Sequence, residues 1–323
     1  MTAPAKFAHA GTADFAADVL RGLASRPKSI PPKYFYDAAG AKLFERITRL
    51  PEYYPTRTEL RILDENAASI AALLRPGAML VEFGSGSTAK IRVLLRKLRM
   101  LAAYVPVDIC AEFLLAEAAA LERDFPWLKV VPVPADFTRP FRLPPLPGPT
   151  LGFFPGSTIG NFDFAEARSF LGHAAQVLGD GAMLIVGVDL DKDPRILHAA
   201  YNDSAGVTAA FNLNLLRRIN RELGADFDLA RFEHRAFYDE ERKRIEMHLV
   251  SLEAQRVRIG AASIGFEAGE TIHTENSYKY TIEGFQALAR AAGWRPVTVW
   301  TDDARLFSVH VLSHSGSQAP AEA

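Results

Sequence analysis

The sequence predicts an α/β protein whose sheet is mainly parallel and covered by helices on both faces. From residue 78 to residue 188, short apolar runs alternate with segments of helical periodicity. The apolar runs are continuous, as in strands that are buried on both sides, rather than alternating with polar residues. Glycines and carboxylates follow the expected strands, which is typical of the ligand-binding edge of such a sheet.

Composition bounds the class of protein. The chain has 323 residues, 49% of them hydrophobic, which is more than one core usually holds and favours two lobes. Lys and Arg number 37 against 38 Asp and Glu, so a general nucleic-acid binder is not expected. The single cysteine, Cys110, excludes a disulfide framework and a multi-cysteine zinc site. The eight histidines show no spacing typical of metal ligands, so we expect no metal.

The N-terminal sequence bears on location. Charged side chains such as Lys6, Asp14 and Asp18 interrupt any apolar core that a signal peptide would need. No apolar run approaches the roughly 18 residues of a membrane-spanning helix. We therefore expect a soluble, cytoplasmic protein without a membrane partner.

The first part of the chain predicts helices in pieces. Residues 13–23 predict a short helix, and Asp37 is placed to cap a second one. Thr56 and Glu59 have the spacing of a capping box, which predicts a third helix beginning there.

Five strands are expected next, with helices after most of them. A long helix and two antiparallel strands then interrupt the pattern, before a helix and a terminal antiparallel hairpin complete it. The expected strands of the core are 78–83, 104–107, 128–133, 151–154 and 182–188, with helices 88–98, 111–123 and 165–178. The later elements are a helix at 204–223, strands at 231–238 and 243–252, a helix at 281–293, and a hairpin of 297–300 with 306–312.

This order predicts a core interrupted by an insertion. The sheet would hold five parallel strands plus the terminal antiparallel hairpin, and the remaining segments would form a second α+β domain. The expected boundaries are 1–58 for the first part of the second domain, 59–189 for the core, 190–280 for the insertion, and 281–323 for completion of the core.

Three groups of residues at expected strand ends predict a nucleoside site. Gly84 and Gly86 let the backbone approach a ligand before a helix N-terminus, but their spacing does not fit a dinucleotide. Asp108 follows Gly84 by 24 positions, where an acid accepts hydrogen bonds from a ribose. Asp136 could accept from an adenine amino group and Phe137 could pack against its ring. Together they favour an adenosine ligand without phosphates, and S-adenosylmethionine fits best.

Six longer motifs are Tyr34–Asp37, Leu50–Arg57, Gly156–Asn161, Ala205–Asn212, Ile245–Met247 and Thr274–Ser277. They resemble those of a known family, the histidine-specific α-N-methyltransferases of ergothioneine biosynthesis. The resemblance runs from about Pro27 to the final hairpin. It implies a Rossmann-like methyltransferase sheet, a substrate-binding domain, and conversion of L-histidine to trimethylhistidine by three successive methylations. We expect a monomer with this small-molecule substrate and no nucleic-acid partner.

The resemblance also implies roles for individual residues. Tyr36 and Tyr53 would act as catalytic residues that shape the pocket around the substrate amine, and Tyr53 would also contact the substrate. On the substrate side, Asn161 and Tyr201 would hold the α-carboxylate, Met247 would line the imidazole pocket, and Glu275 and Ser277 would hydrogen-bond the imidazole. On the cofactor side, Lys90 would pair with the methionine carboxylate, alongside Gly84, Gly86, Asp108, Asp136 and Phe137.

Each residue also has a structural interpretation. The tyrosines and Met247 could fill a core, Asn161 could cap a helix, Lys90 could be solvated, and Glu275 with Ser277 could be an exposed strand pair. Three other functions stay open: methylation of tryptophan or another aromatic amino acid, cofactor binding without catalysis, and nucleic-acid methylation. Glu275 favours histidine, because a carboxylate facing an imidazole N–H makes a charge-assisted hydrogen bond.

Overall fold

The computed structural model describes residues 10–86, 88–145 and 148–315. The chain divides into two compact units. The four-stranded unit takes the described residues of three segments, and the seven-stranded unit takes the rest of the described chain. The segments of the four-stranded unit are Met1–Ile47, Tyr201–Tyr238 and Ile245–Glu275; those of the seven-stranded unit are Thr48–Ala200, Asp239–Arg244 and Asn276–Ala323.

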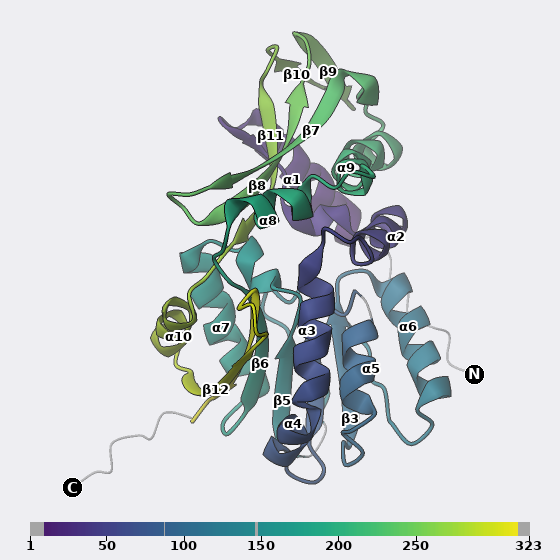
Figure 1. Ribbon diagram of the computed structural model, residues 1–323. Helices are drawn as coiled ribbons and strands as arrows, with labels where there is room; N and C mark the ends of the chain where they lie inside the picture. The colour runs from purple at the N-terminus through teal and green to yellow at the C-terminus, as the bar shows by residue number, and fades with distance from the viewer. Residues whose placement is uncertain (1–9, 87, 146–147, 316–323) are drawn as a thin grey trace, which may run out of the picture. The chain divides into compact units, whose positions relative to one another are not determined.

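The seven-stranded unit contains the expected parallel sheet. Its strand order is β12-β13-β6-β5-β2-β3-β4, in which β2 to β6 pair in parallel and β13 pairs antiparallel with both β6 and β12. Five parallel strands plus a terminal antiparallel hairpin are therefore confirmed (Figure 1). The strands are β2 (Met79–Phe83), β3 (Ala103–Asp108), β4 (Val133–Pro134), β5 (Thr150–Phe154), β6 (Met183–Asp189), β12 (Arg295–Thr301) and β13 (Phe307–Ser313).

Helices cover both faces of this sheet, because neighbouring residues of each strand point to opposite sides. Val81 of β2 packs in a cluster with side chains of α7 and α10, whereas Leu80 packs in a second cluster with side chains of α3, α4, α5 and α6. The helices are α3 (Tyr54–Glu65), α4 (Ala67–Leu73), α5 (Ala89–Leu95), α6 (Ala111–Asp124), α7 (Phe164–Leu178), α8 (Pro194–Tyr201) and α10 (Ile282–Ala291), with the short 3₁₀ helix η2 (Thr158–Asn161).

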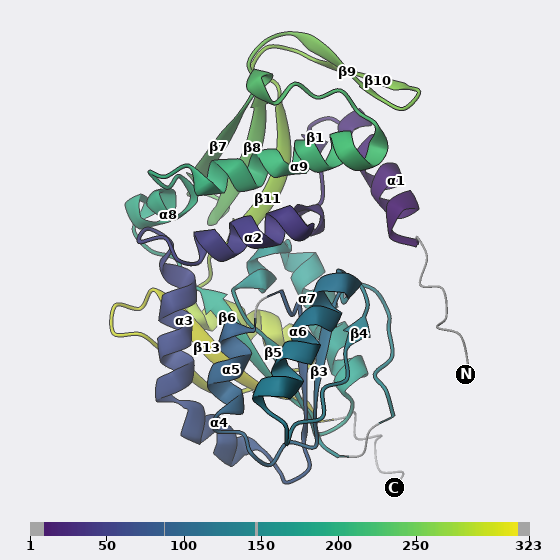
Figure 2. The same ribbon diagram turned by 90° about the vertical axis from the view of Figure 1, so that its right-hand side faces the viewer.

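The four-stranded unit is an α+β unit. Its sheet has the order β1-β11-β8-β7, and β9 and β10 form a separate antiparallel hairpin (Figure 2). The strands β8 and β11 continue for one to three residues into the seven-stranded unit. The elements are α1 (Ala10–Ala24), β1 (Lys28–Ser29), η1 (Pro32–Phe35), α2 (Ala38–Ile47), α9 (Val207–Leu223), η3 (Leu229–Arg231), β7 (Phe232–Asp239), β8 (Arg244–Ser251), β9 (Gln255–Ile259), β10 (Ala262–Phe266) and β11 (Thr271–Tyr278).

Two helix caps show how local sequence sets these elements. The expected cap at Asp37 is confirmed, since its carboxylate accepts a hydrogen bond from the backbone N–H of Gly40 at 2.7 Å. Before α9, the carboxylate of Asp203 accepts from the backbone N–H groups of Val207 and Thr208, both at 2.8 Å. These bonds satisfy N–H groups that a helix start otherwise leaves without a partner.

The third expected strand is wrong in length. Instead of a strand over 128–133, the structure has β4 at Val133–Pro134 and an isolated bridge between Tyr104 and Val130. Pro132 and Pro134 lack the N–H that a ladder needs, which explains why the pairing is so short.

The expected capping box of Thr56 and Glu59 is also wrong. Helix α3 begins at Tyr54 with Pro55 in its first turn, a position that suits the fixed φ of proline. Glu59 is fully buried and binds elsewhere in the seven-stranded unit. A sequence pattern cannot distinguish an acidic side chain that caps its own helix from one that serves a distant partner.

The division into units falls at different residues from the expected ones. Residues 48–58 and 190–200 belong with the seven-stranded unit, as do the short segments 239–244 and 276–280. The β9–β10 hairpin and helix α8 were not expected from the sequence. None of the helices in the described ranges is long and apolar enough to cross a membrane.

Candidate active site

Three parallel strands of the seven-stranded unit end together. Phe83 at the end of β2 is in register with Val107 of β3, and Glu82 is in register with Phe153 of β5. The segments that leave these strands therefore start at one edge of the sheet, where open α/β sheets bind their ligands. Of the predicted cofactor residues, Gly84, Gly86 and Lys90 follow β2, Asp108 ends β3, and Asp136 and Phe137 follow the neighbouring β4.

Gly84 makes the first turn after β2 possible. Its φ of +77° lies in a region that side chains with a Cβ rarely adopt. A Cβ built there would lie 3.3 Å from Cε1 of Phe137, so the phenyl ring sits directly over this turn. Around Gly86, by contrast, a Cβ would meet no described atom within 4 Å. The structure thus brings Gly84 and Phe137 together and leaves Gly86 without a close neighbour among the described residues.

The two predicted carboxylates of the cofactor site are each held in a local turn. Asp108 accepts a hydrogen bond from the backbone N–H of Cys110 at 2.8 Å, and Asp136 accepts one from that of Thr138 at 3.0 Å. Burial raises the pKa of Asp108, while the N–H groups of Cys110 and Ile109 oppose that rise. A carboxylate has about four lone-pair sites, so Asp108 can also accept from a ligand hydroxyl.

Lys90 meets a buried acid in this structure. Its Nζ lies 2.6 Å from Oε2 of Glu59, whose carboxylate also accepts from the backbone N–H of Gly156 at 2.9 and 3.0 Å. A Cβ built on Gly156 would lie 3.0 Å from the same Nζ. The lysine is therefore positioned by an acid that sequence reasoning had assigned to a helix cap. An ammonium group has three donors, so this pairing leaves room for the predicted contact with a carboxylate.

A second buried acid lies beside the glycine turn. Glu82 is 1% exposed and is hydrogen-bonded by the hydroxyl of Tyr104, which also lies 3.2 Å from Oγ of Ser85. Burial raises the pKa of Glu82 to about 8, against the opposing effects of Tyr104 and Lys90. Glu82 is therefore mainly neutral at pH 7.

Ser277 belongs to a buried charged network. Its Oγ accepts from Nζ of Lys279 at 2.6 Å, and that ammonium also donates to Asp189 at 2.8 Å. Lys192 donates to the other oxygen of Asp189 at 2.6 Å. The hydroxyl of Tyr54 lies 2.8 Å from each of the two carboxylate oxygens of Asp189. Sequence reasoning missed the network, because its members come from three separate segments.

Tyr53 and Asn161 are the other predicted substrate residues of the seven-stranded unit. Tyr53 is the residue before α3, is 8% exposed, and accepts through its backbone oxygen from Arg57 at 3.0 Å. Asn161 ends η2, and its half-buried side chain makes no hydrogen bond within the described ranges. The amide of Asn161 is thus available to a carboxylate.

The four-stranded unit holds the remaining four predicted residues. Tyr36 follows η1, and its ring contacts Phe44 at a centroid distance of 5.6 Å. Tyr201 ends α8, and its backbone oxygen lies 2.9 Å from Nε2 of His234. Met247 in β8 is 1% exposed and Glu275 in β11 is 9% exposed, so both side chains are mostly withdrawn from solvent. Their substrate contacts stay predictions.

The sheet and its edge define a class. A parallel sheet closed by an antiparallel hairpin carries a glycine turn, two carboxylates and a phenyl ring at its strand ends, which suits a nucleoside cofactor. A model of the family described as histidine-specific methyltransferases, S-adenosylmethionine-dependent, matches residues 15–314. The chain therefore belongs to this family, and S-adenosylmethionine is its cofactor.

The chain is also similar to individual proteins. A histidine N-alpha-methyltransferase of Mycolicibacterium smegmatis is 45% identical over 92% of this chain and 95% of its own length. Ergothioneine biosynthesis protein 1 of Neurospora crassa is 30% identical over 90% of this chain, which corresponds to 33% of that longer protein. A solved S-adenosylmethionine-dependent methyltransferase from Clostridium acetobutylicum has a TM-score of 0.46 and 12% identity, covering 80% of this chain and 91% of its own.

Proposed function

We propose that this methyltransferase converts L-histidine to trimethylhistidine, also called hercynine, by three successive methylations of the α-amine, as a step of ergothioneine biosynthesis. The observation that carries the proposal is the 45% identity, over 92% of the chain, to a protein named histidine N-alpha-methyltransferase. The name of the Neurospora relative supports the pathway. The cytoplasmic location, the monomeric state and the absence of a nucleic-acid partner stay predictions.

The residues of the seven-stranded unit would hold the cofactor. Asp108 would accept from the ribose hydroxyls, Asp136 from the adenine amino group, and Phe137 would pack beside the adenine over Gly84. Lys90, held by Glu59, would pair with the methionine carboxylate. Gly86, which has no close neighbour among the described residues, would let the cofactor approach the backbone of the turn. The bound cofactor supplies a methyl group on a sulfonium, and each transfer forms an N–C bond while the C–S electron pair passes to sulfur.

Substrate residues would act mainly by alignment. Asn161 and Tyr201 would hold the α-carboxylate, while Tyr36 and Tyr53 would shape the space around the amine. Correct alignment of reacting groups contributes several kcal/mol, up to about 7–11 in ideal cases. The amine must lose one proton before each transfer, and a pocket tyrosine or solvent water would receive it.

The test is mass spectrometry of products formed from S-adenosylmethionine and an equimolar mixture of amino acids. We expect histidine alone to gain mass, in three steps of one methyl group each. Product that stops at one or two methyl groups would contradict the trimethylation. Methylated tryptophan, or another aromatic amino acid, would favour the alternative substrate class and leave the cofactor site intact.

Substitution of Glu275 tests substrate recognition. A site that hydrogen-bonds an imidazole N–H strongly rejects analogues that lack it. Glu275→Ala should therefore lower kcat/KM for histidine by at least about 100-fold, and it should raise the relative rate with tryptophan, whose indole is larger and more apolar. Glu233→Ala, which removes an exposed carboxylate from β7 of the same unit, is the control and should keep wild-type kinetics. Unchanged histidine kinetics in Glu275→Ala would show that this residue does not select the substrate.

A further inference from the structure

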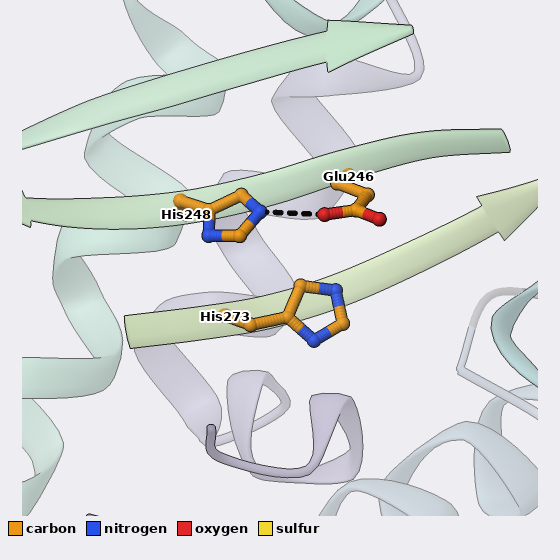
Figure 3. Close-up of side chains that lie close together, drawn as sticks. All are labelled: Glu246, His248 and His273. Carbon is orange, nitrogen blue, oxygen red and sulfur yellow. Dashed lines mark hydrogen bonds and ion pairs between the residues drawn. The ribbon is translucent and has the colours of Figure 1, made fainter. Parts of the chain in front are cut away.

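Three side chains that commonly bind metal ions meet on the sheet of the four-stranded unit. They are Glu246 and His248 of β8 and His273 of β11. Each offers one ligand atom, and these atoms lie within 4.8 Å of one another (Figure 3). This metal-ligand cluster, defined as Glu246, His248 and His273, lies outside the residues predicted to bind substrate or cofactor.

Regular strand geometry puts the cluster together. Glu246 and His248 are two positions apart, so they share one face of β8. β8 and β11 are neighbours in the sheet, and the ring centroids of His248 and His273 are 5.0 Å apart. The cluster thus rests on two paired strands rather than on loops, and rigid elements hold ligands more accurately than loops do.

The orientation of His248 suits a ligand. Its Nε2 lies 2.8 Å from Oε2 of Glu246, and its Nδ1 lies 3.2 Å from Oγ1 of Thr271. The ring of Phe237 stacks on it at a centroid distance of 5.3 Å and an interplanar angle of 17°. Metal-binding histidines usually have the second ring nitrogen held by a neighbouring group, which fixes ring orientation and tautomer. Thr271 can serve this purpose for His248.

His273 is held in a comparable way. Its Nε2 lies 3.1 Å from the backbone oxygen of Glu275, which fixes the ring against β11. Glu246 is 8% exposed and both imidazoles are half-buried. A carboxylate with so little solvent gains more from a cation than an exposed one, because the lower local dielectric strengthens the attraction.

We propose that the metal-ligand cluster is a binding site for a divalent late first-row transition-metal ion such as Zn²⁺. Two imidazoles and one carboxylate are a ligand set for zinc and related ions, whereas Mg²⁺ and Ca²⁺ prefer oxygen ligands alone. A fourth position would be filled by water. An ion there would connect β8 to β11 and thereby stabilise the four-stranded unit.

The distances require a small closing movement. Zinc bonds to nitrogen and oxygen are about 2.0–2.2 Å long, so two ligand atoms on one tetrahedral ion lie about 3.3–3.6 Å apart. The atoms of Glu246 and His248, now 2.8 Å apart, would separate slightly when the ion replaces the proton between them. The widest separation in the cluster, up to 4.8 Å, would close by up to about 1.5 Å through rotation of the His273 side chain.

Sequence spacing did not indicate this site. Glu246 and His248 form a short pair, but His273 lies 25 positions further along and is separated from it by the β9–β10 hairpin. A glutamate and a histidine two positions apart in a strand fit ordinary polar alternation. Only the paired strand shows that His273 lies beside them. The expectation of no metal therefore rested on spacing along the chain alone.

The test is isothermal titration of the chelator-treated full chain with Zn²⁺ in the absence of cofactor and substrate. We expect one saturable site with a micromolar or lower Kd. His273→Ala and Glu246→Gln should each weaken binding at least about tenfold, which is the least that loss of even a supporting group costs. His198→Ala, which removes an exposed histidine of α8, is the matched control and should bind Zn²⁺ like the wild type. Titration with Mg²⁺ should show no binding.

A second readout separates loss of the site from loss of folding. Co²⁺ absorbs visible light when bound by nitrogen and oxygen ligands in a four-coordinate site, so its spectrum reports the site directly. We expect this band in the wild type and in His198→Ala, and its loss in Glu246→Gln, which keeps the size of the side chain. Undiminished binding in both cluster variants, or equal loss in His198→Ala, would mean an adventitious ion only and would overturn the proposal.

Discussion

Two carboxylates of the seven-stranded unit are equally buried yet carry different charges at neutral pH. Asp189 at the end of β6 and Glu82 in β2 are each 1% exposed. Burial by itself would raise the pKa of both carboxyl groups. For Asp189 the nearby Lys192 and Lys279 outweigh it, and the resulting pKa lies below the usual value. Glu82 has a tyrosine hydroxyl as its nearest partner, and its pKa rises to about 8. The supply of cations, rather than the depth of burial, decides which acid is ionised.

The difference in charge between Asp189 and Glu82 goes with a difference in their surroundings. At the end of β6, a charged network joins Asp189 to Lys279 and Ser277 within the seven-stranded unit. Beside the glycine turn, the neutral Glu82 avoids placing another full negative charge next to Asp108. A neutral acid there adds no further repulsion at Asp108, the predicted acceptor for a ribose. Three substitutions test the contrast, beginning with the largest expected effect.

Removal of a cation from Asp189 should be the most damaging change. Lys279→Met leaves a buried carboxylate with one ammonium group, and breaking a buried pair costs about 3–5 kcal/mol of unfolding free energy. Urea unfolding at pH 7 measures this loss. The matched control is Lys243→Met, which breaks the exposed ion pair with Asp191 and should cost about 1 kcal/mol or less. Equal losses in the two variants would show that burial adds nothing to the Asp189 network.

The pH dependence of the two acids should run in opposite directions. The native pKa of Asp189 is lowered, so its contribution is present above the unfolded value of 3.8 and is lost on further acidification. The native pKa of Glu82 is raised, so its contribution is complete below 4.5 and is lost as the pH rises through about 8. The two residues therefore act in different pH ranges.

Substitution of Glu82 isolates the second effect. As the pH rises, the unfolding free energy of the wild type should fall relative to that of Glu82→Gln by about 1.4 kcal/mol per pH unit. Between pH 5 and pH 7 the total difference should be about 3 kcal/mol. Urea unfolding of both proteins at the two pH values measures it. Parallel pH profiles for the two proteins would mean that Glu82 is ionised throughout, and the contrast with Asp189 would be lost.

Glu59 is an intermediate case, because it is fully buried with one cation and one backbone N–H. Glu59→Gln keeps the acceptor for Gly156 and removes the charge that positions Lys90. Affinity for S-adenosylhomocysteine, measured by calorimetry, should fall about tenfold, or about 1.4 kcal/mol. Affinity for methylthioadenosine, which has no amino-acid end, should not change. An equal fall for both ligands would instead indicate general disturbance of the site.

Much of the sheet follows from local patterns in the sequence. Continuous apolar runs such as residues 182–188 predicted buried strands, and the observed β6 covers Met183–Asp189. Glycine at residue 84 predicted a tight turn, which the positive φ confirms. Those patterns are local, because a strand buried on both faces must be apolar throughout and a turn with positive φ favours glycine.

Other features depended on partners that are distant in the chain. Glu59 had the spacing of a capping residue, yet it meets Gly156 and Lys90 across the core. Asp189 had the position of a strand end, and only the fold supplies Lys192, Lys279 and Tyr54 around it. A side chain with several possible partners takes the one that the packed structure offers, and no local pattern records that choice.

The sequence by itself determined the parallel sheet, the terminal hairpin and the family, because apolar periodicity, glycine turns and long motifs are written in consecutive residues. The tertiary structure decided which acids are charged, which side chain positions Lys90, and which histidines meet Glu246. The physical reason is that ionisation, hydrogen bonding and metal ligation depend on distances of a few ångströms in space. Folding brings residues as far apart as Glu59 and Gly156 to within 3.0 Å.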